Sequence, residues 1–276
     1  MAREISTSNT AFLTRRTGDP LDGYLVRWFH GTTGLEASLC GHASLAAAHV
    51  LFSSNAVPSS QMLRLHTRGG LVTCAVQSES SDGTLGPVIA ADFPALSVIE
   101  TPQPQQQCAS LQKALGPGVP VPIFIGSVPE TGDVFVCLES PETVRGMQPN
   151  MGALASLSTR GVIVTAAIHN GDGAPGPVWA RGAHFVSRWF APHVGVPEDA
   201  VTGSAHCALA PFWGARLGRT AMLGYQASLR EGTIAMQLSG GGEQQQRVAL
   251  IGRCATTLRG EVVAPVPLGY ETFMHA

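Results

Sequence analysis

The sequence predicts an α+β protein made of two pseudo-symmetric halves, each a strongly twisted, barrel-like sheet around one central helix. Three observations support this prediction: a repeated motif, the two alanine-rich segments that follow it, and many short strand-like runs separated by 32 glycines and 19 prolines. A chain of 276 residues can bury the core of one large or two ordinary domains. We expect a first half over residues 1–100 and a second over 101–276, and we consider a last strand that returns to the first half.

The repeat consists of a strand, a turn-rich loop, a glycine and an alanine-rich helix. Residues 27–29 and 188–190 both read Arg-Trp-Phe, and Gly41 and Gly203 follow fourteen and fifteen positions after the respective arginines. A single repeat with a period of about 160 residues indicates a duplicated domain, since solenoid repeats are far shorter. Helices with such small side chains can be wrapped closely on all sides by a curled sheet.

The other elements follow from hydrophobic periodicity and from the residues that bound each run. Besides the first Arg-Trp-Phe strand, we expect strands at residues 71–77, 121–125, 134–138, 162–168, 183–190 (which includes the second Arg-Trp-Phe), 233–238 and 247–251. Helices are expected at residues 45–52, 107–115, 149–158 and 205–217. Residues 92–107 are rich in proline and glutamine and are expected to link the two halves.

Composition argues against several classes of partner. The formal net charge is 17 − 19 = −2, and the chain lacks the clustered basic residues that nucleic acids require. No apolar run reaches the length of a membrane span, and the polar N-terminus does not resemble a signal peptide. The six cysteines are scattered without a Cys-x-x-Cys pair, which predicts buried thiols in a reduced compartment. We therefore expect a cytoplasmic protein that binds a small molecule, with no metal and no cofactor.

Two sequence features suggest other kinds of chemistry, but the residues around them do not support either one. Residues 171–176 match Gly-x-Gly-x-x-Gly, but a Pro-Val-Trp run follows instead of a helix, so a hairpin loop is expected rather than a dinucleotide site. Lys113, the single lysine, lies in a polar helix beside the expected linker, which argues against a Schiff-base enzyme. No His-x-x-x-His pair is present to bind a metal.

The two helix starts carry the residues suited to catalysis. A helix N-terminus presents backbone N–H groups and positive potential, and Gly41 and Gly203 let a ligand approach that backbone closely. His42 follows the first glycine, and Asp199 lies in the loop before the second. Two such helix starts facing each other would hold a carboxylate or a developing enolate, while His42 and Asp199 transfer a proton.

Several of these segments resemble the signatures of the PhzF (phenazine biosynthesis) family: residues 27–29, 39–46, 190–199, 202–206, 226–230 and 251–261. The resemblance covers roughly residues 1–264. It implies the diaminopimelate-epimerase-like fold, a site between the halves, a homodimer, and cofactor-free proton transfer in secondary metabolism, as in isomerisation of a dihydro-hydroxyanthranilate. The family's catalytic histidine, aspartate and serine correspond to His42, Asp199 and Ser204, with Gly41, Thr202 and Gly203 as substrate-binding residues.

The N-terminus departs from the family in two ways. Asn9 stands where the family has the glutamate that acts as general acid/base, and an amide can form hydrogen bonds but cannot exchange protons near neutral pH. The chain also begins at this segment, which we expect to be helical. The first half is therefore expected to lack its opening strands and to have an exposed sheet edge. A shortened gene product would explain this, as would a partner or second copy that covers the edge.

Three interpretations of function follow from the sequence. The first is an isomerase that uses His42, Asp199 and Ser204, with Asn9 as an orienting amide. The second is a racemase or dehydratase in which Cys40 and Thr202, each just before a helix glycine, act as the acid/base pair, since a helix N-terminus stabilises a thiolate. The third is a non-catalytic protein that kept the fold after losing the glutamate at position 9.

Overall fold

The computed structural model describes residues 2–5, 9–16, 23–37, 39–78, 86–101, 105–168, 177–241 and 244–261. The first half contains α1 (Ala2–Ile5), β1 (Asn9–Arg15), β2 (Tyr24–His30), β3 (Glu36–Ala37), α2 (Gly41–Ser53), β4 (Leu63–Thr67), β5 (Gly70–Ser78) and β6 (Val88–Pro94). The second half contains β7 (Ile99–Glu100), α3 (Gln105–Leu115), β8 (Phe124–Val128), β9 (Asp133–Cys137), α4 (Pro141–Gly146), α5 (Met151–Ala155), β10 (Gly161–Ala167), η2 (Val178–Ala180), β11 (Phe185–Phe190), η3 (Pro192–Val194), α6 (Gly203–Leu217), β12 (Ala221–Gln226), β13 (Gly232–Gly241) and β14 (Gln244–Arg253).

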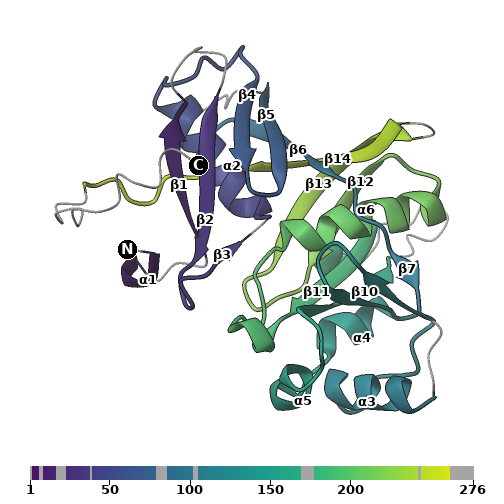
Figure 1. The fold of residues 1–276 in the computed structure, drawn as a ribbon. Helices are drawn as coiled ribbons and strands as arrows, with labels where there is room; N and C mark the ends of the chain where they lie inside the picture. Colours follow the sequence, from purple (N-terminus) through teal and green to yellow (C-terminus); the bar gives the residue numbers. More distant parts are fainter. Residues whose placement is uncertain are drawn as a thin grey trace.

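The strands join into one continuous sheet that runs through both halves (Figure 1). Its order is β1-β2-β4-β5-β6-β14-β13-β12-β11-β10-β9-β8-β7, and β3 pairs with β2 off this path. The two halves meet where β6 pairs antiparallel with β14. The last strand is therefore hydrogen-bonded to the first half as well as to its own neighbour β13.

The order and directions of the strands show the internal repeat. The sets β1-β2-β4-β5-β6 and β10-β11-β12-β13-β14 each begin with an antiparallel pair, continue with a parallel pair, and end with two antiparallel pairs. One long helix follows the second strand of each set, α2 in the first and α6 in the second. Trp28 and Trp189 lie at equivalent positions of β2 and β11. The α+β fold with two similar halves is thus confirmed.

The two central helices are buried along most of their lengths, as the small side chains predict. In α2, the alanines at 43, 47 and 48 are buried, and in α6 those at 205, 208 and 210 are buried. At Gly214 an added Cβ would lie 2.6 Å from a methyl carbon of Leu238 on β13, so the sheet packs against the helix backbone itself. Because small residues let strand and helix approach this closely, the sheet can curl around each helix.

One hydrophobic cluster spans both halves, and a second belongs to the second half. The spanning cluster contains Leu65 and Phe93 from the first half and Phe135 and Phe212 from the second, with Leu250 of β14 among them. The smaller cluster packs α3, α4 and α5 against the far face of β9, β10 and β11. The halves therefore share a core in addition to a sheet.

Some expected elements differ from those observed. The expected N-terminal helix is wrong from residue 9 onward, because Asn9 begins strand β1, whose register aligns Asn9 with His30. The strand expected at 121–125 begins only at Phe124, since Pro120 and Pro122 cannot donate to a ladder. The helix expected at 149–158 is the short α5, which starts after its N-cap Asn150.

The expected linker is also partly regular structure. Residues 92–94 belong to β6 and residues 99–100 to β7, and the helix α3 already begins at Gln105. Asp92 pairs with Thr73 of β5 and Ala249 of β14 in the sheet, and its side chain forms an ion pair with Arg247 of β14. The hairpin loop expected at 171–176 lies outside the described residues.

None of the described helices is long and apolar enough to span a membrane. Among the described residues, no group of three or more His, Cys, Asp or Glu side chains is arranged to hold a metal ion. The described cysteines are free thiols, and four of them are buried: Cys40, Cys74, Cys137 and Cys207.

Candidate active site

The N-termini of the two central helices meet at their glycines. An added Cβ on Gly41 would lie 2.8 Å from the Cα of Gly203, and one on Gly203 would lie 2.7 Å from the Cα of Gly41. Leu250 of β14 lies beside this contact, with a methyl carbon 3.4 Å from either added Cβ. Only glycine fits at both positions, because any side chain would push one helix backbone against the other.

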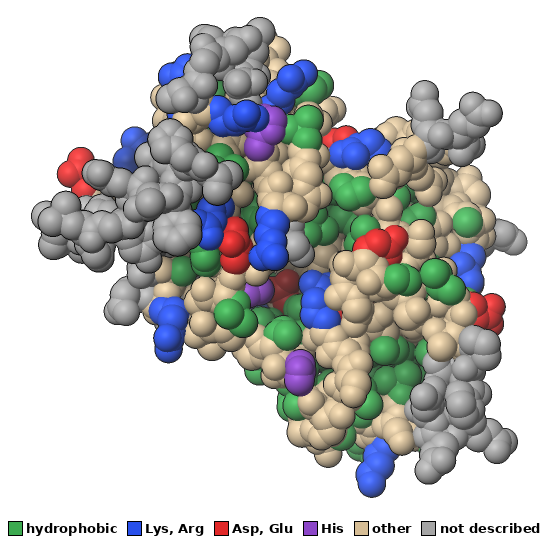
Figure 2. Space-filling model, viewed as in Figure 1, with side chains coloured by type: hydrophobic (Ala, Val, Ile, Leu, Met, Phe, Trp, Pro, Cys, Tyr) green, Lys and Arg blue, Asp and Glu red, His purple; other side chains and the backbone are tan. Residues whose placement is uncertain are grey.

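A small pocket of about 50 Å³ lies at this contact and is lined by both halves. A wider cleft of about 350 Å³ shares Gly41, His42, Asp199 and Gly203 with it. Figure 2 shows histidine, acidic and basic side chains gathered in the hollow between the two lobes. The pocket lining consists of Asn9, His30, Leu39, Cys40, Gly41 and His42 from the first half, and Arg160, Trp189, Val196, Asp199, Thr202, Gly203 and Ser204 from the second.

The first-half wall brings an amide, a thiol and an imidazole together. Asn9 Nδ2 donates to Cys40 Sγ at 3.0 Å and lies 3.4 Å from His42 Nε2. Cys40 Sγ lies 3.7 Å from His42 Nε2. Burial lowers the pKa of His42, but its hydrogen bond and electrostatic attraction to Cys40, with a smaller contribution from Asp199, raise it to about 9. His42 therefore carries a proton at neutral pH.

The second-half wall holds a carboxylate in a fixed orientation. Thr202 Oγ1 donates to Asp199 Oδ2 at 2.9 Å, and the Ala200 N–H donates to Asp199 Oδ1 at 3.0 Å. Gln226 fixes the loop from behind: its Nε2 donates to the Asp199 carbonyl at 2.8 Å, while its Oε1 accepts from the Thr202 N–H at 2.8 Å. The Asp199 carboxylate is thus positioned before any ligand arrives.

Ser204 lies in the first turn of α6 and accepts a hydrogen bond from the Arg160 guanidinium. Arg160 Nη2 donates to Ser204 Oγ at 3.3 Å, and the guanidinium lies over the Trp189 ring, 5.1 Å from its centroid. The same arginine forms a two-point ion pair with Asp133, whose carboxylate is almost fully buried. This pairing holds the guanidinium at the edge of the pocket.

Two further histidines are neutral: His30 lines the pocket, and His206 is buried in the first turn of α6. Burial lowers the pKa of His30, and the nearby Arg160 and His42 lower it further. His206, one turn into α6, is fully buried, and burial lowers its pKa to about 4 despite the hydrogen bond that its Nδ1 makes with the Thr202 carbonyl at 2.8 Å. His206 therefore supports the start of α6 without carrying charge.

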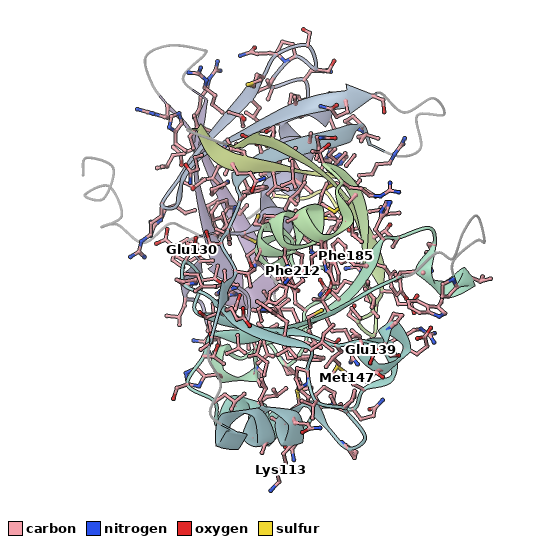
Figure 3. All side chains as sticks on the ribbon, turned by 90° about the vertical axis from the view of Figure 1, so that its right-hand side faces the viewer. Lys113, Glu130, Glu139, Met147, Phe185 and Phe212 are labelled. Atoms are coloured by element: carbon pink, nitrogen blue, oxygen red, sulfur yellow. The ribbon has the colours of Figure 1, made fainter. Side chains whose placement is uncertain are left out.

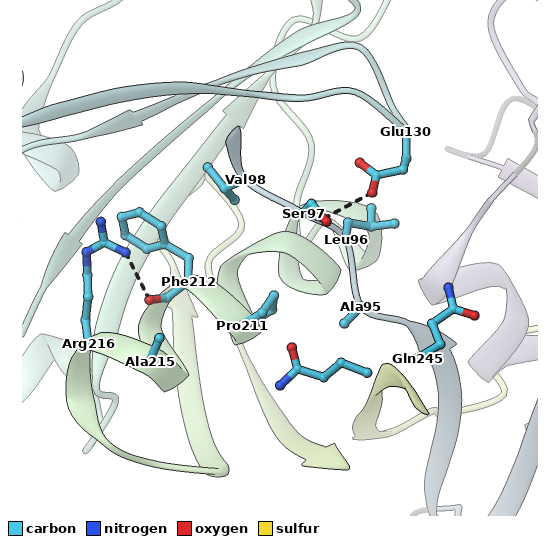
Figure 4. A pocket seen from close by; sticks show the side chains of 11 residues that line it. Ala95, Leu96, Ser97, Val98, Glu130, Pro211, Phe212, Ala215, Arg216 and Gln245 are labelled. Carbon is cyan, nitrogen blue, oxygen red and sulfur yellow. Dashed lines mark hydrogen bonds between the residues drawn. The ribbon is translucent and has the colours of Figure 1, made fainter. Parts of the chain in front are cut away.

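Another cavity lies elsewhere, against α6 (Figure 4). It has a volume of about 480 Å³, and its charged lining residues are Glu130 and Arg216. Both are engaged with backbone, since Glu130 accepts from the Ser97 N–H and Arg216 donates to the Phe212 carbonyl. Its lining holds no histidine or cysteine, so this cavity lacks the acid–base groups that the smaller pocket has.

Lys113 is far from this chemistry. It is exposed and extends from α3 into solvent at one end of the molecule (Figure 3). The sequence-based exclusion of Schiff-base chemistry through this lysine therefore agrees with its position.

The structure brings together every site residue that the sequence predicted. His42, Asp199, Ser204 and Asn9, the substrate-binding candidates Gly41, Thr202 and Gly203, and Cys40 all line the pocket. Their individual roles stay predictions. Arg160, Trp189 and His30 were not predicted as site residues. Trp189 was visible as part of the repeated motif, whereas Arg160 precedes a strand like any loop arginine and gives no signal in the sequence.

Known proteins resemble this chain over most of its length. A family model described as "Phenazine biosynthesis-like protein" (PhzC-PhzF) matches residues 1–260. A protein of Halalkalibacterium halodurans named an uncharacterized isomerase is 34% identical over 264 residues, which are 95% of this chain and 85% of that protein. A similarly named protein of Pseudomonas aeruginosa is 37% identical over 262 residues, again 95% of this chain and 85% of the relative.

Solved structures show the same fold. A PhzF-family protein of Enterococcus faecalis superposes with a TM-score of 0.70 at 31% identity, covering 91% of this chain and 81% of that one. A probable proline racemase of Agrobacterium radiobacter K84 reaches a TM-score of 0.55 at 10% identity, covering 94% and 77%, which is a likeness of fold alone. From its sequence match, its relatives and its fold, the chain belongs to the phenazine biosynthesis-like (PhzC-PhzF) family.

Proposed function

We propose that this protein is a cofactor-independent isomerase that moves a proton on a small carboxylated metabolite of the dihydro-hydroxyanthranilate type. The observation that carries the proposal is the meeting of two helix N-termini in a pocket with proton-transfer groups on both walls. Isomerase names among the relatives support the same reaction class.

The helix starts supply the binding site for negative charge. The first N–H groups of α2 and α6 have no partner within their helices, and neither N-cap side chain, Cys40 or Thr202, bonds to them. These groups, with the positive ends of both helix dipoles and the Arg160 guanidinium, would hold a carboxylate and stabilise an enolate as it forms.

The walls supply the proton transfer. His42, protonated at neutral pH, is a donor on one wall, while Asp199, held by two hydrogen bonds, is an acceptor on the other. A substrate between them can lose a proton at one carbon and gain one at another without a redox change. The roughly 50 Å³ pocket and the adjoining 350 Å³ cleft together admit a single-ring metabolite but no polymer.

Asn9 favours a second candidate, a binding protein that performs no catalysis. Its amide cannot replace the proton-transfer role of a carboxylate. The racemase alternative with Cys40 and Thr202 is less well supported, since the Thr202 hydroxyl donates its proton to Asp199 and accepts from Gln226.

The test is turnover of a dihydro-hydroxyanthranilate, followed by NMR, with the wild type, His42→Asn and Asp199→Asn. We expect the wild type to form an isomer and each variant to lose about 10²–10⁴-fold in rate. Saturable binding of an anthranilate analogue with no turnover by the wild type would instead support the binding protein. Turnover unchanged in both variants would place the chemistry elsewhere.

A further inference from the structure

Cys40 differs from the other buried cysteines in its surroundings. Burial raises the pKa of Cys74 and of Cys207 to about 12, and that of Cys137 to about 11, so these thiols stay protonated and inert. Cys40 instead lines the pocket at the start of α2, and its sulfur contacts two polar side chains.

Both contacts favour a negative charge on the sulfur. The Asn9 amide donates to Sγ at 3.0 Å, and the His42 ring lies 3.7 Å away on its Nε2 side. A carboxylate at position 9 would lie against the same sulfur and repel a thiolate. With an amide at position 9 in place of a carboxylate, the first-half wall has one base fewer. The Cys40 sulfur beside it has a hydrogen-bond donor instead.

The other residues of this wall are poorer bases. His42 carries its proton at neutral pH, because its pKa is raised to about 9. His30 lines the same pocket, but burial and the nearby Arg160 and His42 lower its pKa, which makes it a weaker base than an ordinary histidine. Asn9 itself cannot exchange a proton.

We propose that Cys40, with its proton held by His42, is the base on the first-half wall that removes a proton from the substrate and returns one to it. This inference rests on the proposed isomerase function. In the step, the Cys40 sulfur takes a proton from a substrate carbon, so an S–H bond forms as a C–H bond breaks. The electron pair moves into the conjugated carboxylate facing the helix N-termini. The S–H exchanges its proton with water and then delivers a proton to a second carbon, and the net change is isomerisation with no oxidation.

A rescue experiment tests the role of Cys40 as a base by measuring the rate of substrate turnover. We expect Cys40→Ala to lose about 10²–10⁴-fold in rate. Adding Asn9→Glu to Cys40→Ala should restore at least tenfold, because a carboxylate again faces the pocket. The control Cys74→Ala, which removes a buried thiol that does not line the pocket, should keep wild-type turnover. Near-wild-type turnover by a folded Cys40→Ala protein, or an equal loss in Cys74→Ala, would overturn the proposal.

A labelling experiment probes Cys40 and its neighbours Asn9 and His42 without any substrate. Iodoacetamide modification at pH 7.5 is followed at each cysteine by peptide mass spectrometry, with the half-buried Cys254 as the internal reference. We expect Cys40 to react at least tenfold faster than Cys254 in the wild type, and to slow at least tenfold in Asn9→Glu and in His42→Asn. Equal rates in all three proteins would refute the proposed role of Cys40. If the wild type turns over no substrate yet shows the expected labelling, the proposed isomerase function fails while the Cys40–His42 pair stands.

Discussion

At the scale of single residues, two glycines set how closely the halves meet. Replacing Gly41 by alanine would place a Cβ 2.8 Å from the Gly203 Cα, a backbone atom that cannot move aside without shifting α6. We expect Gly41→Ala to lower the free energy of unfolding by about 1–3 kcal/mol, measured by urea denaturation.

The matched control is Gly146→Ala at the end of α4. An added Cβ there meets nothing within 4 Å. This change should be neutral, or stabilising by up to about 1 kcal/mol, because alanine favours a helix over glycine. Equal effects of the two substitutions would show that close approach at Gly41 is unimportant.

A buried histidine makes stability depend on pH. Burial lowers the pKa of His206 to about 4, whereas in the unfolded chain it titrates near 6.5. Between these values the unfolded state binds more protons, so folding stability falls as pH drops from 6.5 toward 4, by roughly 1–3 kcal/mol. His206→Asn can keep a donor to the Thr202 carbonyl but cannot titrate.

We therefore expect the wild type to lose more unfolding free energy than His206→Asn between pH 7 and pH 4.5, in urea titrations at each pH. The pKa values of His30 and His49 are also lowered, so these residues add the same dependence of unfolding free energy on pH to both proteins. Identical slopes would mean that His206 is charged in the folded state.

At the scale of elements, each copy of the repeat has an arginine on its strand that pairs with a glutamate in the following segment, and the two pairs can be compared. Arg188 on β11 pairs with Glu198 through two bonds of 2.7 and 3.1 Å, and Arg27 on β2 pairs with Glu36 through bonds of 3.0 and 2.9 Å. The Arg188 side chain is 11% exposed and that of Arg27 is 51% exposed. Arg188 also donates to the Met147 carbonyl.

We expect Glu198→Gln to cost about 1–3 kcal/mol of unfolding free energy, because it leaves a mostly buried guanidinium partly unpaired. Glu36→Gln should cost less than about 1 kcal/mol, since water screens the exposed pair. Thermal or urea denaturation of both variants measures the difference. A larger loss in Glu36→Gln would reverse this ranking.

The elements also show what the sequence could predict. Hydrophobic alternation located β5, β9, β10 and β13, and the repeated Arg-Trp-Phe motif located both central helices. Strands β4 and β12 were not predicted, because the first carries charge and the second contains Gly224, which weakens a strand pattern. Gly224 is needed there because an added Cβ would lie 2.7 Å from the Phe185 ring. Such contacts between distant strands leave no local signal.

The site was predictable only where it coincided with the repeat. Gly41, His42 and Gly203 lie at helix starts that the repeat marks. Arg160 reaches Ser204 across 44 positions in the sequence, and no pattern within one segment encodes that contact.

At the scale of the whole molecule, β14 joins the halves into one cooperative unit. Leu250 is fully buried in the cluster that spans both halves and lies beside the glycine contact. We expect Leu250→Ala to cost about 2–5 kcal/mol and to destabilise both halves equally. Hydrogen exchange should show the amides of β5 and of β11 losing protection together, and selective loss in one half would contradict a shared core.

Deuterium incorporation from D2O tests the central claim, proton transfer in the pocket between the two helix starts, most directly. The wild type converts a dihydro-hydroxyanthranilate in D2O, and mass spectrometry counts deuterons in the product against a blank without enzyme. The account predicts a product that carries solvent deuterium at carbon, since an acid–base group of the pocket exchanges its proton with water. Turnover that leaves the product free of deuterium even at low conversion, or no turnover at all, would contradict it.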